Sequence, residues 1–142
     1  PVRADLSLNE LVRSVDALTR IECRKRNISL SLSLADPDTI IRADGIQLEQ
    51  VLVNIVKNAY EAIGHDGRIR IVTTADPPSV TVEDNGPGIP EEIRKQLFTP
   101  FFTTKPSGQG IGLMFVREVL NNHRMAFSLT SQNGCTRFEI SV

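Results

Sequence analysis

The sequence predicts a mixed α/β domain with helices on one face of a sheet. Three segments, 7–25, 44–63 and 111–122, carry apolar residues at the three- and four-residue steps of a helix. Five runs alternate apolar and polar residues as half-buried strands do, at 28–34, 68–74, 80–83, 126–131 and 136–142. Because helices alternate along the chain with pairs of strands, we expect the helices to share one face of a single sheet.

Capping residues define the helices of the N-terminal half. Ser7 and Glu10 form a capping box for the first helix, and Asp44 with Gln47 opens the central helix. The central helix should run to about Ile63 and end at Gly64. Between these helices, the alternating run 28–34 is followed by a short strand at 39–43.

Turn residues divide the C-terminal half. The turn 76–79 joins the runs 68–74 and 80–83 as a hairpin or as neighbouring strands. Pro90 begins a short helix that should end near Leu97, and residues 98–110 form a loop before the helix 111–122. Asn133-Gly134 is a hairpin turn between the last two strands.

Composition is that of an ordinary globular domain. The 142 residues are most simply one domain, 1–142, with 40% hydrophobic and 23% charged residues. The net charge of −1 gives no reason to expect nucleic acid or direct membrane contact. No apolar run approaches the roughly 20 residues that span a bilayer. Two cysteines, Cys23 and Cys135, are expected to be buried thiols. A chain that opens on Pro1 is expected to be a fragment of a longer protein.

The central helix carries a second, polar face. Gln50, Asn54, Asn58 and Glu61 recur at steps of four, four and three, so they stack along one side of the helix. Asn is a poor residue for a helix interior, because its amide competes for nearby backbone groups. Two interpretations stay open from this helix alone: a solvated face, or a site that faces a ligand.

The segment after residue 83 cannot be regular structure. Asp84 is followed by glycines at 86 and 88, which let backbone approach a ligand closely. A carboxylate only accepts hydrogen bonds, so Asp84 would select the exocyclic amine of adenine over the oxygen of guanine. An ordinary tight turn capped by Asp is the alternative.

A second glycine-rich segment, Gly108-Gln109-Gly110-Ile111-Gly112, leads into the last helix. Free amides at a helix start suit phosphate, although this is neither a P-loop nor a dinucleotide fingerprint. Lys105 in the same loop supplies a cation for a γ-phosphate. Together with Asp84 and Asn58, whose carbonyl oxygen could bind Mg²⁺, these segments are the parts of a site for ATP and Mg²⁺.

These motifs resemble the catalytic, ATP-binding domain of sensor histidine kinases, in the wider ATPase family of DNA gyrase, mismatch-repair proteins and a class of chaperones. The resemblance extends from Asp5 to Val142 and rests on four ordered boxes and a closing strand. The boxes are Gln50-x-x-x-Asn54-x-x-x-Asn58-Ala59, Asp84-x-Gly86-x-Gly88, Phe98-x-Pro100-Phe101 and Gly108-x-Gly110-x-Gly112-Leu113, and the closing strand carries Gly134-x-Thr136-x-Phe138.

The resemblance implies a two-layer sandwich, with three main helices over a mixed sheet of about five strands and ATP held under a lid. It implies Asn58 as the Mg²⁺ ligand, Asp84 and Thr136 at the adenine edge, and Phe98 and Phe101 as lid anchors. Asn54, Asn58 and Lys105 would be the catalytic residues. The full set expected to contact nucleotide is Asn54, Asn58, Asp84, Gly86, Gly88, Ile89, Phe98, Thr103, Thr104, Lys105, Gly108, Gly110, Ile111, Gly112, Leu113 and Thr136.

Three departures from the family pattern refine this expectation. Hydrolytic relatives carry a Glu where this chain has Asn54, which has no useful basicity, so transfer is favoured over hydrolysis. Many kinases of the family have a Lys where this chain has Glu61, which leaves Lys105 as the leading γ-phosphate contact. The family often carries a His-Gly-Gly motif after the last helix. This chain keeps only the His of that motif, His123, which is expected to be structural. Neither His65 nor His123 has the setting of a phosphoacceptor.

The resemblance therefore implies a protein-histidine kinase domain that transfers the γ-phosphate of ATP to a histidine on a helical dimerisation hairpin. That hairpin is the expected partner, with a response regulator downstream, and the isolated domain should not phosphorylate itself. A cytoplasmic location is expected, with a parent protein that could be membrane-anchored. Three alternatives stay open: a degenerate docking module, a hydrolytic ATPase, and a serine kinase of the anti-sigma-factor type.

Overall fold

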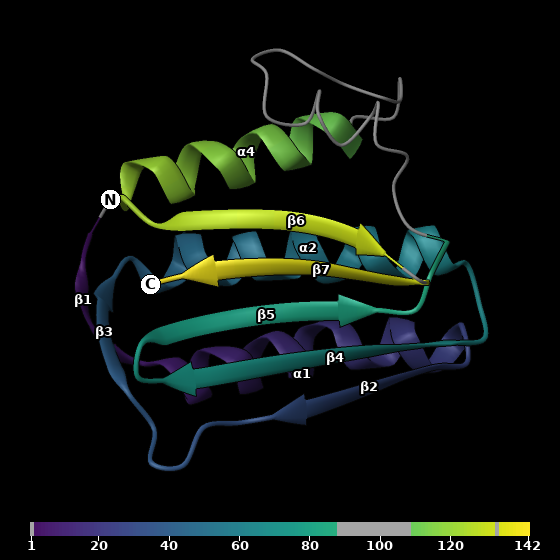
Figure 1. Cartoon of the computed structure of the whole chain (residues 1–142), viewed down its shortest axis with the longest axis horizontal. Helices are drawn as coiled ribbons and strands as arrows, with labels where there is room; N and C mark the ends of the chain where they lie inside the picture. The colour runs from purple at the N-terminus through teal and green to yellow at the C-terminus, as the bar shows by residue number, and fades with distance from the viewer. Residues whose placement is uncertain (1, 88–108, 133) are drawn as a thin grey trace.

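The chain folds into two layers, a sheet and a layer of helices on one of its faces (Figure 1). This computed structural model describes residues 2–87, 109–132 and 134–142. The main sheet has five strands in the order β2-β4-β5-β7-β6; β2 and β4 are parallel and the other neighbours antiparallel. Its strands are β2 (Ile28–Ser33), β4 (Gly67–Ala75), β5 (Pro78–Asp84), β6 (Ala126–Gln132) and β7 (Cys135–Ser141). The predicted mixed α/β class is confirmed.

Three helices form the second layer: α1 (Leu8–Lys25), α2 (Gly45–Ile63) and α4 (Gln109–Asn122). Helix α2 packs against both α1 and α4, so it is the central helix of the layer. Both predicted N-caps are present, because Ser7 Oγ accepts from Glu10 N at 3.1 Å and Asp44 Oδ1 accepts from Gln47 N at 3.1 Å. Helix α2 ends at Gly64, which has a φ of 81°. None of the described helices is long and apolar enough to cross a membrane.

A second, two-stranded sheet was not predicted. Strand β1 (Ala4–Ser7) pairs antiparallel with β3 (Ile40–Ala43), and together they cap one end of the helical layer. The sequence analysis expected the strand at 39–43 but no strand before the first helix. Four residues, of which Asp5 and Ser7 are polar, are too few for an alternation to be recognised.

The helical and sheet layers share one apolar core. Its most buried side chains come from α1, α2, α4 and from the faces of β4, β5 and β7 that meet the helices. The predicted apolar face of α2 is confirmed, because the six buried residues of this helix are each at most 6% exposed. The core residues of the three helices include Leu8, Val12, Val15, Val51, Leu52, Ile55, Val56, Ala59, Val116, Val119 and Leu120.

A closed ring of hydrogen bonds joins the start of α1 to the sheet. Asn9 is only 4% exposed, and its Nδ2 donates to the carbonyl of Ala35 at 2.8 Å. Thr73 Oγ1, on β4, donates to Asn9 Oδ1 at 2.7 Å and accepts from Ala35 N at 2.8 Å. All three buried side-chain polar atoms of the ring are therefore satisfied.

Candidate nucleotide site

Asp84 lies at the end of β5, where the core-facing residues of β5 and its neighbour β7 end. Along β5, Val80, Val82 and Asp84 share one face, since alternate residues of a strand point the same way. In the register of β5 and β7, Asp84 is directly opposite Thr136, so both side chains stand on that same face. The two residues predicted to meet the adenine edge are thus brought together, with Thr136 buried and Asp84 half-buried.

The surroundings of Asp84 favour its role as an acceptor. Its Oδ1 accepts from Gly86 N at 2.9 Å, the one hydrogen bond to it in the described part of the chain. Burial raises the pKa of the Asp84 carboxyl, and the Gly86 amide offsets part of that rise. No donor among residues 2–87, 109–132 and 134–142 reaches the second carboxylate oxygen, so a ligand could donate to it.

Gly86 brings the Asp84 turn against the end of α2. A Cβ at this position would lie 3.0 Å from Asp84 Oδ1 and 3.0 Å from Ile63 Cγ1, so only glycine fits without a shift. Asn85, which the sequence analysis did not select, fixes the turn from the other side. Its Oδ1 accepts from Arg68 N at 2.7 Å, and its own N–H donates to Arg68 O at 3.2 Å. Asn between a strand end and a glycine was the signal that could have identified it.

The polar stripe of α2 faces a hollow and not only open solvent. Gln50 and Asn54 line a hollow of about 480 Å³, together with Val53 of the same helix. One turn further, Asn58 is half-buried, and its Nδ2 is buried with no hydrogen-bond partner among the described residues. An unpaired buried amide costs free energy, so a missing partner such as a ligand is the natural explanation. The other side chains at the hollow are Leu18, Glu49 and Phe115.

Helix α4 begins at Gln109, two residues before the predicted start at Ile111. The boundary differs because Gly110 and Gly112, poor helix formers, lie inside its first turn. The amides of a first turn have no intrahelical acceptor, so phosphate binding by the backbone of residues 110–113 stays a prediction that this helix start allows. The short helix at 90–97 and the lid at 101–108 lie outside the described residues. So do Gly88, Ile89, Phe98, Thr103, Thr104, Lys105 and Gly108.

A comparison with protein families decides the identity of this arrangement. The model of the family described as histidine kinase-, DNA gyrase B-, and HSP90-like ATPase matches residues 43–142. The chain belongs to this ATPase family. Its domain is therefore an ATP-binding domain.

Named relatives of this ATPase domain are sensor kinases. Sporulation kinase A of Bacillus subtilis is 36% identical over 144 residues, which cover 99% of this chain and 24% of that protein. The catalytic domain of the histidine kinase ThkA matches with a TM-score of 0.89 at 34% identity, covering 100% of this chain and 95% of that one. ThkA in complex with the response regulator protein TrrA matches with a TM-score of 0.84 at 31% identity, covering 99% and 41%. The chain thus has the fold of a histidine kinase catalytic domain and spans 24% of the length of the first of these relatives.

The donor set of this ATPase domain fits Mg²⁺ held mainly by nucleotide. In the described part of the chain no group of three His, Cys, Asp or Glu could hold a metal ion. Asn58 fits the role of a single protein ligand to Mg²⁺, because rotating its amide by half a turn puts Oδ1 where the unpaired Nδ2 stands. Mg²⁺ prefers oxygen ligands and usually takes only one or two from the protein, beside phosphates and waters.

Two remaining expectations concern His123 and the cysteines. His123 is structural as expected: its Nε2 accepts from Asp44 N at 3.1 Å and its Nδ1 donates to Val119 O at 2.9 Å. It therefore ties the end of α4 to the N-cap of α2. Cys23 is buried as expected, but Cys135 is only half-buried, because it begins β7 beside the turn.

Proposed function

We propose that this ATP-binding domain holds ATP with Mg²⁺ and donates the γ-phosphate to a histidine on the dimerisation hairpin of the same kinase. The observation that carries the proposal is the opposed pair of Asp84 and Thr136 at the sheet end. That pair places a half-buried acceptor next to a hydroxyl. Gly86 lies so close to Asp84 and Ile63 that a larger residue there would force a shift. A flat base that donates from one edge fits this geometry.

Adenine would be selected by hydrogen-bond polarity. The free oxygen of Asp84 accepts the exocyclic amine, and the Thr136 hydroxyl can donate or accept beside it. Guanine presents an oxygen at the same position, which would face the carboxylate and leave both acceptors unpaired. The site is therefore expected to discriminate against GTP.

The phosphates would lie toward Asn58 and the start of α4. Asn58 would offer Oδ1 to Mg²⁺, which would neutralise negative charge on the phosphates. The first-turn amides of α4, at Gly110 and Gly112, would orient the phosphates, and Lys105 would contact the γ-phosphate. Catalysis by these groups is positioning and charge neutralisation.

Transfer is favoured over hydrolysis at this site. Asn54, a member of the polar stripe, lines the hollow at the position where a hydrolytic relative carries the carboxylate that activates water. An unprotonated imidazole nitrogen needs no such base, because its own lone pair forms the N–P bond. The bond from the γ-phosphorus to the bridging oxygen breaks, ADP leaves, and the imidazole releases its remaining N–H proton to solvent.

The wider context follows from the named relatives. Because ThkA is a histidine kinase solved with a response regulator, we propose that a response regulator accepts the phosphoryl group from the histidine of this kinase too. We also propose that the domain works on the cytoplasmic side, where ATP is available. The dimerisation hairpin remains the immediate partner.

Calorimetric titration of the chain with non-hydrolysable ATP and GTP analogues, with and without Mg²⁺, tests the binding step. We expect adenine-selective binding that Mg²⁺ strengthens. Incubation with ATP and the hairpin of the same kinase then tests transfer, read as acid-labile phosphate on the hairpin. Equal binding of both analogues would contradict the adenine assignment. Multiple-turnover ATP hydrolysis without phosphorylation of the hairpin would contradict the transfer reaction.

A further inference from the structure

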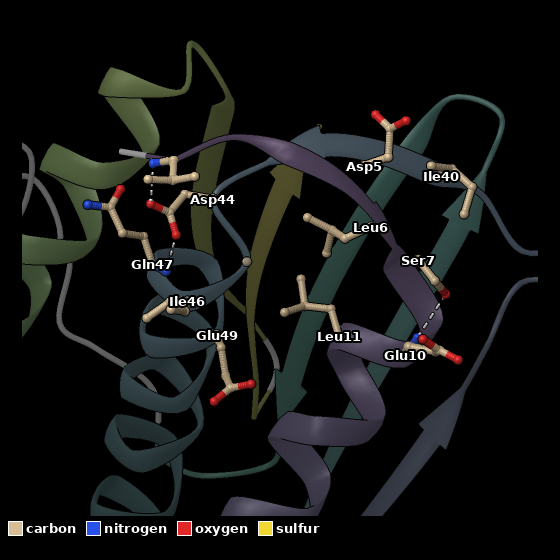
Figure 2. Close-up of a pocket in the computed structure, with 12 residues that line it drawn as sticks. Asp5, Leu6, Ser7, Glu10, Leu11, Ile40, Asp44, Ile46, Gln47 and Glu49 are labelled. Carbon is tan, nitrogen blue, oxygen red and sulfur yellow. Dashed lines mark hydrogen bonds between the residues drawn. The ribbon is translucent and has the colours of Figure 1, made fainter.

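A groove lies between the N-terminal ends of α1 and α2, far from the Asp84 turn (Figure 2). Its volume is about 940 Å³. Leu6 from β1 and Leu11 from α1 form its floor, and Ile46 and Glu49 of α2 stand on the opposite wall (Figure 2). The remaining lining residues are Val2, Asp5, Ser7, Glu10, Ile40, Asp44, Gly45 and Gln47.

The groove gathers apolar side chains that the fold leaves in water. Ile46 is 75% exposed and Ile40 is 63% exposed, although neither is needed for a cap or a turn. With Val2, they make up three of the five most exposed large hydrophobic side chains in the described part of the chain. Scattered apolar residues need no explanation, but a group that lines one groove marks an interaction surface.

The charge at the same groove has one sign. Four carboxylates line it, and none of its described lining residues is Lys, Arg or His. Glu10 stands on the α1 wall and Glu49, which accepts from Ser14 Oγ at 2.7 Å, on the α2 wall. The other two, Asp5 and Asp44, lie toward the β1–β3 end.

Two arginines near the groove and the charged N-terminus, which acts on Asp44, offset only part of this negative charge. Arg42 makes a long, exposed ion pair with Asp5 at 3.5 Å. Arg3 is engaged with the carbonyl of Asn122. Asp44 accepts amides from its own helix start, which lowers the pKa of its carboxyl and keeps it ionised at neutral pH.

We propose that this groove docks a basic amphipathic helix of a partner polypeptide. The apolar stripe of that helix would enter between α1 and α2 and contact Leu6, Leu11 and Ile46. Lys and Arg residues flanking the stripe would reach Glu10 on one wall and Glu49 on the other. A cleft between two helices with an apolar floor is the usual seat of a third helix. Nucleic acid and anionic lipid would be repelled by the same carboxylates.

The groove is separate from the Asp84 turn, and its wall residue Glu49 also lines the hollow beside Gln50 and Asn54. Ile46 lies in the first turn of α2 and Ile63, which contacts the Gly86 position, in its last. At 1.5 Å per residue the two are roughly 25 Å apart. A partner could therefore dock while ATP is bound, and the inference does not depend on the proposed transfer reaction.

A synthetic amphipathic peptide of roughly 18 residues, with a Leu stripe flanked by Lys, serves as the probe. Its binding to the chain is measured by calorimetry and by the NMR signals of the Ile40 and Ile46 methyl groups. We expect Ile46→Ser and Glu10→Lys each to weaken binding at least tenfold. Ile21→Ser is the matched control, because Ile21 is 65% exposed on α1 but lines neither the groove nor the hollow near Asn54. A peptide with Glu in place of Lys should not bind, and added salt should weaken the Lys peptide.

Four results would overturn the proposal. The first is no binding, and the second is equal binding to the wild-type chain and Ile46→Ser. The third is displacement of the peptide by an ATP analogue, which would place the peptide at the nucleotide site. The fourth is self-association of the chain that Ile46→Ser abolishes, since the groove would then belong to a second copy. Loss of nucleotide binding with intact peptide binding would instead contradict only the proposed function.

Discussion

Replacing Asp84 with Asn separates the role of this carboxylate in binding from its effect on folding. The change keeps the shape of the side chain, and Asn Oδ1 can still accept the Gly86 amide that Asp84 Oδ1 accepts at 2.9 Å. The second position becomes an NH₂ group, which would face the amine of adenine. Two donors then meet where a donor and an ionised acceptor had met.

The expected loss of affinity follows from these two changes. A hydrogen bond to a charged group contributes about 1.5–3 kcal/mol, and leaving a buried donor unpaired costs about 1–3 kcal/mol more. The total of about 2.5–6 kcal/mol corresponds to roughly 10²- to 10⁴-fold in Kd. We therefore expect no measurable binding of an ATP analogue at concentrations that saturate the wild-type chain.

The stability of the folded chain should not fall with the affinity for nucleotide. Burial raises the pKa of Asp84 in the folded chain above its unfolded value, so the folded state holds this proton more tightly. The contribution of Asp84 to stability is then fully present below the ordinary carboxyl pKa of about 3.9 and is lost as pH rises through the raised pKa. Asn carries no charge, so the variant should be at least as stable as the wild type at pH 7. The gap should narrow as pH falls toward about 4.

Calorimetric titration measures the affinity, and urea unfolding followed by circular dichroism at pH 7 and pH 4 measures the stability. Asp76→Asn is the matched control, because Asp76 is exposed in the turn at the other end of the β4–β5 hairpin. It should leave ATP binding unchanged. An Asp84→Asn chain that binds the ATP analogue within threefold of the wild type would refute the adenine assignment. A variant that is less stable at pH 7 would refute the account of the buried charge.

Three further substitutions test the packing and the ligand role of particular residues. Gly86→Ala brings a Cβ to 3.0 Å from Ile63 Cγ1 and should lower the free energy of unfolding by about 1–3 kcal/mol, measured in urea; an unchanged midpoint would show that the turn can move away. His123→Ala leaves the Asp44 amide without its side-chain acceptor and should lower Tm by roughly 3–9 °C at about 3 °C per kcal/mol, measured by calorimetry, whereas a Tm within 1 °C would contradict the tie between α4 and α2. Asn58→Ala should remove most of the Mg²⁺-dependent gain in ATP affinity and leave Mg²⁺-free binding within about threefold, and a full Mg²⁺ gain would exclude Asn58 as a ligand.

The local structure was predictable where short-range signals agree. Helix α2 begins after Asp44 and ends before Gly64 as predicted, because a cap, an apolar period and a positive-φ glycine all indicate the same boundaries. The two hairpins of the main sheet were predictable for a similar reason, since each joins alternating runs across a short turn. These features depend on residues within a few positions of one another.

The arrangement of the strands was not predictable from pattern alone. The order β2-β4-β5-β7-β6 places the last strand of the chain between β5 and β6, and nothing local in the residues of β7 specifies a neighbour that far away in sequence. The β1–β3 pair was missed because its strands are only four residues long. Such pairings depend on the burial of whole faces, which a single window of sequence does not show.

The residues of the candidate site were predicted from sequence, but their arrangement was not. Asp84 and Asn58 were selected from their residue types, yet the alignment of Asp84 with Thr136 depends on strand register. Asn85 was missed because its function is to hold backbone, and an Asn at a turn has many uses. The early start of α4 was missed because tertiary packing overrides the low helix propensity of glycine.

The ring formed by Asn9, Thr73 and Ala35 has a consequence for how α1 is seated. Apolar contact between a helix and a sheet is nearly indifferent to small sliding, because one methyl group replaces another. A ring of polar atoms in the same layer is not indifferent, since a slip of one residue would orphan several buried donors and acceptors at once. The ring therefore fixes the position of α1 along the sheet. Swapping the polar side chains of Asn9 and Thr73 for apolar ones of equal volume would leave the N–H and carbonyl of Ala35 unpaired, so it should lower the free energy of unfolding and let α1 sample more than one alignment on the sheet.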